Sequence, residues 1–386
     1  MPNPQSKIEK LIAELCPNGV EFKELGKVCQ FRRGSTITKE GITEGDVPVI
    51  AGGQKPAYYH NIANRSRETI AVSSSGAYAG FVSFWTIPVF LSDSFSVDPD
   101  PQLLIPKYVF YFLKNLQTEI HLSKKGGGVP HVHGSDLENF RIPLPPIAIQ
   151  EEIVKILDSF TELEAELEAE LEARKKQYEH YRTQLFAIDS GLFTIESICK
   201  KISSGGTPST SKSSYYGGTI PWLRTQEVDW VDVHDASIKI TEDGLKNSSA
   251  KMIPKNCVIV AMYGATAGKV AINKIPLTTN QACCNLEIDE NKANYRYVFH
   301  WLSLQYKQLK SLGMGSQSNI NAQIVRDFKI PIPSLFAQNR IVSILDKFDA
   351  LVNDISIGLP AEILARKQQY EYYRGKLLTF KELQAG

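Results

Sequence analysis

Two segments of the chain come close to motifs that carry chemistry, and neither completes one. Residues 264–270 (GATAGKV) resemble a phosphate-binding loop but are one residue too short and lack a Ser or Thr after the Lys. Residues 144–147 (LPPI) lack the leading Asp or Asn and the trailing aromatic residue of an adenine methyltransferase motif. No G-x-G-x-x-G follows an expected strand, and no paired acidic-plus-lysine nuclease pattern is present. Polar residues without a reaction centre favour a binding protein over an enzyme.

Metal chemistry is not indicated either. His131 and His133 alternate on a strand-like segment, and we expect no metal there. The cysteines are scattered and form no C-x-x-C, which argues against a zinc site and fits a reduced, cytoplasmic location. They stand at Cys16, Cys29, Cys199, Cys257, Cys283 and Cys284.

Basic and amide side chains gather near the expected turns, and these residue types bind DNA. Arg, Asn and Gln can form paired hydrogen bonds with base edges in the major groove, whereas Lys suits phosphate oxygens. For any single one, the alternative role of a solvated surface residue stays open. The candidate DNA-binding residues of the first half are Arg32, Arg33, Gln54, Lys55, Arg65, Arg67, Lys124, Lys125, His131 and His133. Those of the second half are Lys200, Lys201, Arg224, Gln226, Lys269, Gln317, Asn319 and Asn321.

The elements that must position these residues occur twice. Residues 140–160 match residues 328–348 at a constant offset of 188, and both copies end in I-L-D-x-F. Residues 173–185 match residues 365–377 at an offset of 192, so the second copy carries four extra residues in between. An internal repeat of this kind indicates two copies of one structural unit.

The repeat continues upstream in weaker form. Residues 76–80 (GAYAG) pair with residues 264–268 (GATAG), and the Gly-rich residues 126–133 pair with residues 314–321. Each copy is therefore a variable globular half followed by a similar long helix.

The helical parts carry a coiled-coil pattern. Pro145 and Pro146 end the preceding strand and open a helix over 147–186. Apolar or amphipathic residues follow at steps of three and four, with one stutter. About 37 residues in helix give roughly 55 Å. A second helix over 336–381 repeats the pattern, with a break expected at 358–360 (GLP). We expect the two to pack antiparallel; the alternative is two ordinary core helices of separate domains.

Residues 162–172 (ELEAELEAELE) contain six Glu. Such a run repels phosphates, so we expect it to face away from DNA or to meet a basic partner. A merely solvated helix face is the open alternative.

Composition sets the broad class. The formal net charge of the 386 residues is only +1, so any DNA-binding residues must lie on local faces. Apolar residues make up 42%, and no apolar run is long enough for a membrane span. Short β-rich runs such as 48–51 and 257–263 alternate with helical segments such as 106–114 and 294–309. The expected fold is mixed α/β (α+β).

The segments P-L-P-P and P-I-P-S, the following Q-x-x-I-V-x-I-L-D-x-F and the later A-R-K-x-Q-Y-x-x-Y-R resemble the conserved regions of type I restriction-modification specificity (S) subunits. The resemblance covers the whole chain and is specific in the helices but loose in the globular halves. It implies target-recognition domains over 1–146 and 187–335, separated by conserved spacer helices over 147–186 and 336–381, with pseudo-twofold symmetry.

The resemblance also implies a function. The chain would bind double-stranded DNA at two short half-sites with an unspecified gap between them. Two methyltransferase subunits would dock on the helices, and motor-nuclease (restriction) subunits would join them. S-adenosylmethionine, ATP and magnesium would belong to those partners, leaving this chain without a catalytic site, cofactor or metal. The alternatives are a free-standing DNA methyltransferase fragment and a structural coiled-coil scaffold.

Overall fold

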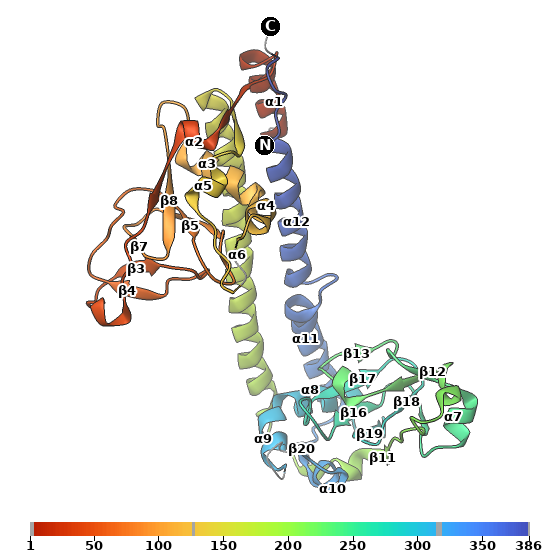
Figure 1. Cartoon of the computed structure of the whole chain (residues 1–386). Coiled ribbons are helices and arrows are strands. Elements are labelled where there is room, and N and C mark those ends of the chain that lie inside the picture. Colours follow the sequence, from red (N-terminus) through yellow and green to blue (C-terminus); the bar gives the residue numbers. More distant parts are fainter. Residues whose placement is uncertain (1–3, 126–127, 314–318, 385–386) are drawn as a thin grey trace. The chain divides into compact units, whose positions relative to one another are not determined.

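The computed structural model describes residues 4–125, 128–313 and 319–384, and the bounds below refer to these residues (Figure 1). The chain divides into two compact units: Met1–Ala169 with Glu362–Gly386, and Glu170–Ala361. Each unit holds one globular half and parts of the long helices. Within the described residues, no helix combines the length and apolar character that crossing a membrane requires.

The first globular half (residues 1–146) is built on a four-stranded antiparallel sheet in the order β2-β8-β5-β6. A second sheet has the order β4-β3-β7, with β3 and β7 parallel, and β1 pairs with β9. The strands are β1 (Glu21–Glu24), β2 (Cys29–Arg33), β3 (Val47–Ile50), β4 (Tyr58–His60), β5 (Thr69–Ser73), β6 (Val82–Trp85), β7 (Phe90–Leu91), β8 (Ser94–Pro99) and β9 (Arg141–Leu144). The helices are α1 (Pro4–Leu15), α2 (Leu25–Val28), η1 (Lys39–Gly41), α3 (Pro106–Asn115), α4 (Gln117–Leu122) and α5 (Gly134–Leu137).

The second globular half (residues 187–335) has a larger sheet in the order β11-β19-β16-β17-β13, in which β13 is parallel to β17. Another sheet has the order β14-β12-β18-β15, and β10 pairs with β20. The strands are β10 (Leu192–Thr194), β11 (Cys199–Ser204), β12 (Tyr216–Leu223), β13 (Asp232–Val233), β14 (Lys239–Ile240), β15 (Met252–Ile253), β16 (Val258–Ala261), β17 (Val270–Asn273), β18 (Leu277–Thr279), β19 (Cys283–Ile288) and β20 (Lys329–Pro331). The helices are η2 (Glu196–Ile198), η3 (Ser213–Tyr215), η4 (Thr225–Glu227), α7 (Glu242–Lys246), α8 (Tyr295–Leu304), α9 (Tyr306–Ser311) and α10 (Ala322–Asp327).

The apolar runs seen in the sequence form the centres of these sheets. Every residue of β5 and of β16 is buried, because these strands are covered on both faces. The prediction of a single helix over 294–309 is wrong, because the structure has two helices, α8 and α9, in this segment. They are divided at Gln305, whose ψ of +12° lies outside the helical region.

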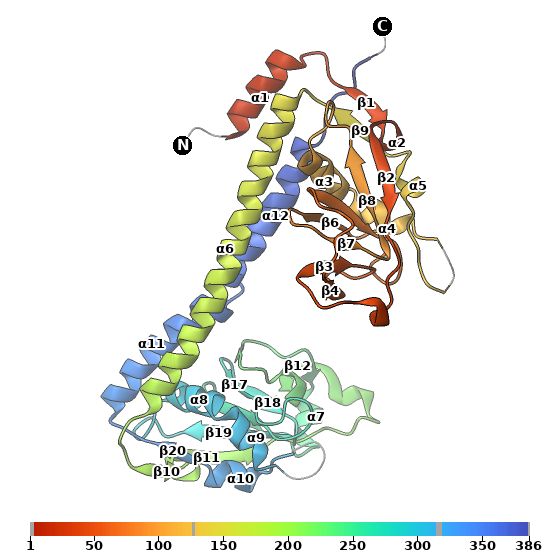
Figure 2. The same cartoon turned by 90° about the vertical axis from the view of Figure 1, so that its left-hand side faces the viewer.

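The long helices pack antiparallel, as the sequence predicts. Helix α6 (Ile147–Phe186) is a continuous helix of 40 residues, and α12 (Leu359–Leu377) lies along its first part (Figure 2). There Phe160 stacks on Tyr373, with ring centroids 5.6 Å apart. In the second unit, Tyr178 of α6 stacks on Phe348 of α11 (Leu335–Asn353), with centroids 6.1 Å apart.

The second long helix is interrupted between α11 and α12, close to the expected break. The turn needs glycine, since a Cβ atom on Gly358 would lie 2.4 Å from Ala350 O. Helix α12 itself begins with Leu359 and Pro360, where proline is tolerated because the first amides of a helix have no partner.

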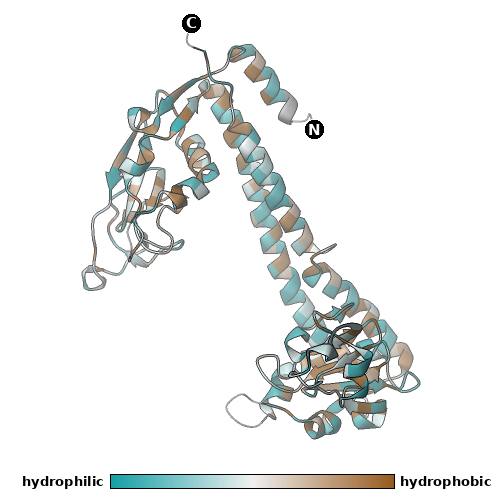
Figure 3. Cartoon of the chain, turned by 45° about the vertical axis from the view of Figure 1, so that its right-hand side comes forward, coloured by the Kyte–Doolittle hydropathy of each residue, from teal (hydrophilic) through white to brown (hydrophobic). Residues whose placement is uncertain are grey.

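The Glu-rich stretch of α6 meets a cation of the same unit. Lys367 Nζ lies 3.2 Å from the carboxylate of Glu164 and 2.9 Å from that of Glu168. Hydrophilic colour prevails along α6 in Figure 3. Glu170 and Glu172 pair with Arg174 and Lys175 of α6 itself, so four of the six Glu contact basic residues of the chain.

The same polar joint attaches each globular half to the helix that follows it. The side chain of Gln150 accepts a hydrogen bond from Ile105 N (2.9 Å), and that of Gln338 accepts one from Asn294 N (2.8 Å). One helical carboxylate per unit completes the joint: Lys107 lies 2.7 Å from Asp158. The equivalent carboxylate of α11 is that of Asp346, which lies 2.7 Å from Arg296.

Candidate nucleic-acid interface

Three segments of the first globular half converge at one place. Ser73 Oγ donates to Ala51 O (3.1 Å), Val132 N donates to Ser74 O (2.9 Å), and Gly76 N donates to Pro130 O (3.0 Å). These bonds join residues 51–55, 73–80 and 128–133, which we call the first loop cluster. The convergence brings Gln54, Lys55, His131 and His133 to one region of the half, with Lys124 and Lys125 at its border.

The second globular half repeats this arrangement. Thr266 Oγ1 donates to Thr225 O (2.7 Å), Ile320 N donates to Met262 O (2.9 Å), and Gly264 N donates to Asn319 Oδ1 (3.3 Å). Residues 224–227, 262–268 and 319–321 form the second loop cluster. It contains Arg224, Gln226, Asn319 and Asn321 among the predicted residues.

The glycines of the repeated G-A-x-A-G segments explain why residues 264–270 resemble a phosphate-binding loop. Gly76 and Gly80 both have φ of +82°, and Gly264 and Gly268 have φ of +82° and +86°. Each pair shapes the turn between two antiparallel strands, where only glycine adopts this conformation without strain. The pattern thus serves a hairpin rather than a nucleotide.

The bordering lysines of the first loop cluster are held by the protein. Lys124 Nζ donates to Ala77 O (3.0 Å), and Lys125 Nζ lies 2.5 Å from Asp136. Burial alone would raise the pKa of Asp136, but hydrogen bonds from Lys125 and the His133 amide hold that pKa below its usual value. The rings of His131 and His133 stack with centroids 6.0 Å apart. Gln54 and Lys55 are exposed.

The candidate DNA-binding arginines of the first half lie elsewhere, on β2 and in the loop before β5. The guanidinium of Arg65 makes hydrogen bonds within the protein: Nε donates to Ser96 Oγ (2.9 Å) and Nη2 donates to Arg32 O (2.9 Å). Its role in this structure is to fix the edge of the sheet. Arg32 Nε lies 2.6 Å from Asp98, which raises the pKa of Arg32. Arg33 and Arg67 are exposed.

Several candidates of the second half also make internal contacts. Arg224 Nη2 donates to Ser237 Oγ (3.4 Å), and Asn321 Oδ1 accepts from Ile324 N (2.9 Å) as the N-cap of α10. Lys269 Nζ lies 2.6 Å from Asp229 and 4.4 Å from the centre of the Trp230 ring. Gln226, Lys200 and Lys201 are exposed, the two lysines on β11. Gln317 lies outside the described residues.

Sequence reasoning missed the exposed aromatic residues beside these candidates. Trp230 is 39% exposed and has a φ of +53°, which is unusual for a bulky residue and marks local strain. Tyr59 and Tyr78 are likewise exposed near Lys55 and the first Gly-rich turn. These aromatic residues were not predicted because the candidates were chosen among basic and amide residues alone. Their position next to charged turns is the sequence signal that could have indicated them.

The arrangement offers hydrogen-bond donors, acceptors and cations rather than a reaction centre. In the part of the chain that the structure describes, no three or more His, Cys, Asp or Glu side chains are grouped as a metal site. The cysteines are unbridged thiols. Burial raises the pKa of Cys257 to about 12, so this thiol stays protonated at neutral pH.

Comparison with known proteins gives a consistent result. A family model described as "Type I restriction modification DNA specificity domain" matches residues 17–173 and 188–365. The specificity subunit of the type I restriction enzyme EcoR124I/EcoR124II from Escherichia coli is 38% identical over 302 residues, covering 74% of this chain and 73% of that protein. A putative type I restriction enzyme specificity subunit from Haemophilus influenzae is 27% identical over 401 residues, covering 98% of this chain and 100% of that protein.

The fold is also that of solved structures. The S subunit of a type I restriction-modification system from M. genitalium superposes with a TM-score of 0.64 at 20% identity, covering 93% of this chain and 96% of that one. A chain from a structure on the assembly and conformational transition of the type I system gives a TM-score of 0.63 at 16% identity, covering 94% and 98%.

Proposed function

The chain belongs to the family of type I restriction-modification DNA specificity subunits, and on this premise we propose that it recognises a bipartite target in double-stranded DNA. Its own role is sequence specificity, without catalysis. In this proposal residues 1–146 and 187–335 are two target-recognition domains, each binding one half-site. Residues 147–186 and 336–381 are the spacer helices, and the bases between the half-sites are not specified.

One observation carries the proposal: the same loop cluster occurs in each half with different side chains on it. The first cluster presents Gln54, Lys55 and two histidines, whereas the second presents Arg224, Gln226 and two asparagines. A guanidinium suits the acceptors of guanine, and an amide suits the donor and acceptor of adenine. Two similar loop clusters that carry different hydrogen-bond donors and acceptors are suited to two different half-sites.

The predicted residues fall into two classes under this proposal. Arg33, Gln54, Lys55, Arg67, Lys200, Lys201 and Gln226 are exposed and are assigned to direct contact with bases or phosphates, and the half-buried Arg224 is assigned to the same role. Those bound to the protein's own carboxylates or carbonyls, such as Arg65 and Lys125, position the exposed ones.

Partners follow from the repeat as well. We assign one methyltransferase subunit to each copy of the repeated helix, and restriction subunits to the assembly that cleaves DNA. S-adenosylmethionine, ATP and magnesium are assigned to those partners, and the assembly to the cytoplasm. Size measurement after co-expression with the methyltransferase should give one copy of this chain to two of the partner. A one-to-one complex, or methyl transfer by this chain alone, would contradict the assignment.

The decisive test exchanges one globular half. Replacing residues 1–145 with the matching part of another specificity subunit should change one half-site of the methylated sequence and leave the other intact. Sequencing of methylated positions in the genome of the host measures both half-sites at once. Alteration of neither half-site would favour a scaffold that does not itself select sequence, and alteration of both would contradict the assignment of one half-site to each globular half.

A further inference from the structure

The second globular half has an element for which the described part of the first half offers no counterpart. Strand β13 adds a fifth strand to its main sheet, parallel to β17, whereas the sheet of the first half ends at β6. The chain reaches β13 directly from the second loop cluster, through Asp229 and the strained Trp230. Ile272 N donates to Val231 O (3.0 Å) and Lys274 N to Val233 O (2.9 Å), so a short backbone ladder holds the segment.

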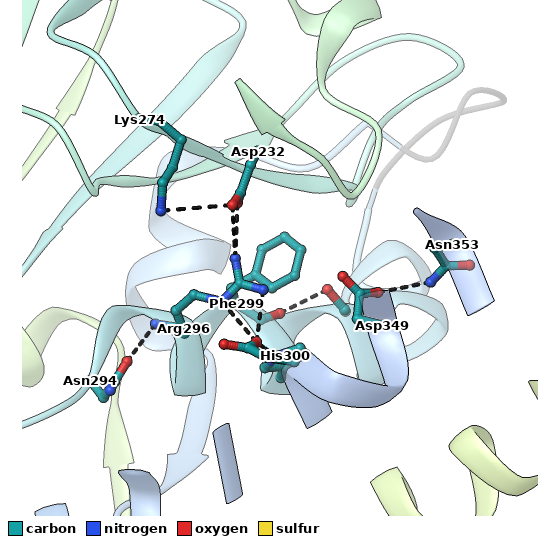
Figure 4. Close-up of polar contacts among 10 residues, drawn as sticks. Asp232, Lys274, Asn294, Arg296, Phe299, His300, Asp349 and Asn353 are labelled. Atoms are coloured by element: carbon teal, nitrogen blue, oxygen red, sulfur yellow. Dashed lines mark hydrogen bonds and ion pairs between the residues drawn. The ribbon is translucent and has the colours of Figure 1, made fainter. Parts of the chain in front are cut away.

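A single guanidinium connects this edge strand to the long helix. Arg296 of α8 places Nη1 at 2.9 Å from Asp232 Oδ1 of β13 and at 3.1 Å from its Oδ2. Its other face binds Asp346 of α11, with Nε at 2.9 Å and Nη2 at 2.7 Å from Oδ1. Figure 4 shows Arg296 and Lys274 both directed at Asp232, and Lys274 Nζ lies 3.7 Å from Asp232 Oδ2.

On the helix side of this bridge, a buried histidine supports a half-buried carboxylate. His300 is fully buried, and its Nε2 lies 2.7 Å from Asp346 Oδ1, where the ring nitrogen donates because the carboxylate accepts. Burial alone would raise the pKa of Asp346, but the hydrogen bonds from His300 and Arg296 hold that pKa below its ordinary value. The side chain of Arg296 is only 15% exposed, so its ion pairs are screened less than surface pairs.

The first half offers an internal comparison. Lys107 occupies the place of Arg296 in the repeat and binds Asp158 of α6 at 2.7 Å, and Tyr111 occupies the place of His300 and donates to the same carboxylate at 2.5 Å. A lysine presents one compact charge, whereas the planar guanidinium can bind two carboxylates in fixed directions. The replacement of Lys by Arg therefore coincides with the additional strand.

We propose that Arg296 is a positioning residue for DNA recognition: it fixes residues 224–237, which carry Arg224 and Gln226, to helix α11. This rests on the proposed function, in which the second half recognises its own half-site. Without the guanidinium, Asp232 and Asp346 face one another as like charges. Both line a groove of about 1480 Å³ in the second unit, which gives the segment room to move and water room to enter. A displaced segment contacts the bases less selectively.

The experiment uses the full chain in complex with its methyltransferase. Arg296→Met removes both ion pairs, Asp232→Asn weakens the strand side alone, and Arg296→Lys keeps one charge. The readout is the methylation rate on target DNA compared with DNA carrying one changed base in either half-site. We expect Arg296→Met to lower discrimination at the second half-site about tenfold, or about 1.4 kcal/mol, with a smaller loss for Asp232→Asn and partial recovery in Arg296→Lys. Discrimination at the first half-site stays unchanged.

Lys107→Met is the matched control, because it removes the equivalent ion pair of the first unit. It should leave the second half-site untouched. Equal loss of methylation on every DNA by Arg296→Met would indicate general destabilisation and overturn the positioning role, as would unchanged discrimination. The exchange of residues 1–145 separates the two proposals. If the exchange changes one half-site while Arg296→Met changes neither, only the role of Arg296 is refuted.

Discussion

Removing one tetrad from α6 tests whether this helix sets the distance between the half-sites. Deletion of residues 166–169 (ELEA) shortens the helix by about 6 Å and turns everything after it by about 40° beyond a full turn. One base pair of B-DNA advances about 3.4 Å and turns about 35°. The rotations agree closely, and the excess rise must be taken up by tilt or by the interruption between α11 and α12. We therefore expect the unspecified gap to shorten by one base pair with both half-sites preserved.

The contacts of the first unit indicate that the shortened helix still packs. After the deletion, Glu172 takes the place of Glu168 and Leu171 that of Leu167, because both residue types recur every four positions. Lys367, which now lies 3.2 Å and 2.9 Å from the carboxylates of Glu164 and Glu168, thus finds two carboxylates again. The seam facing α12 keeps its leucines.

Methylation sequencing of the deletion strain measures the gap directly. An unchanged gap, or altered half-site bases, would refute the idea that the length of α6 sets the distance between the half-sites. Deletion of only residues 166–168 is the matched control: it turns the following helix by about 60° less than a full turn and moves Leu171 off the seam. We expect that variant to lose methylation, whereas equal tolerance of both deletions would show that the packing of α6 does not constrain the gap.

Three further predictions concern single residues. Arg224→Ala should weaken recognition of the second half-site by roughly 1–3 kcal/mol if its guanidinium contacts a base edge; binding titrations that show no change at any salt concentration would remove it from the interface. Gln150→Ala leaves the amide of Ile105 without its buried acceptor and should lower the free energy of unfolding by about 1–3 kcal/mol in urea titrations, so an unchanged midpoint would contradict the joint described above. The pKa of Asp346 is held below its ordinary value, so its contribution to stability is present above a pH of about 3.9 and is lost as the pH falls through the lower pKa of the folded state. Asp346→Asn should therefore melt below the wild type at neutral pH, with a difference that shrinks in acid; a constant difference would rule out this titration as the cause.

Local patterns were sufficient for the long helices. Pro145 and Pro146 mark the start of α6, and the spacing of apolar residues predicts both the packing face and the antiparallel partner. The division between α8 and α9 at Gln305 was not predicted, because no proline or glycine marks it in the sequence. The solved relatives confirm the prediction of mixed α/β halves. This prediction was possible because β-rich runs and turns are indicated by residues that lie close together in the sequence.

The candidate site was less predictable, because the role of a polar side chain depends on acceptors that the fold brings from far away. Arg65 was chosen as a DNA-binding residue by type, yet its guanidinium is bound by Ser96 and by the backbone of β2. Asn321 is occupied as a helix cap. Arg296 was overlooked for the same reason, since its partners Asp232 and Asp346 stand 64 and 50 residues away along the chain.

The joint between each globular half and its following helix has a consequence for how such genes diversify. The helix contributes the same residues to both copies, Gln150 with Asp158 and Gln338 with Asp346, whereas the globular side varies between Lys107 and Arg296. A recombination event whose crossover falls within the repeated helix sequence therefore joins a new globular half to a helix that already carries the matching glutamine and aspartate. The matching segments of the two helices are thus both the attachment point of each globular half and a stretch of repeated sequence at which recombination can exchange that half.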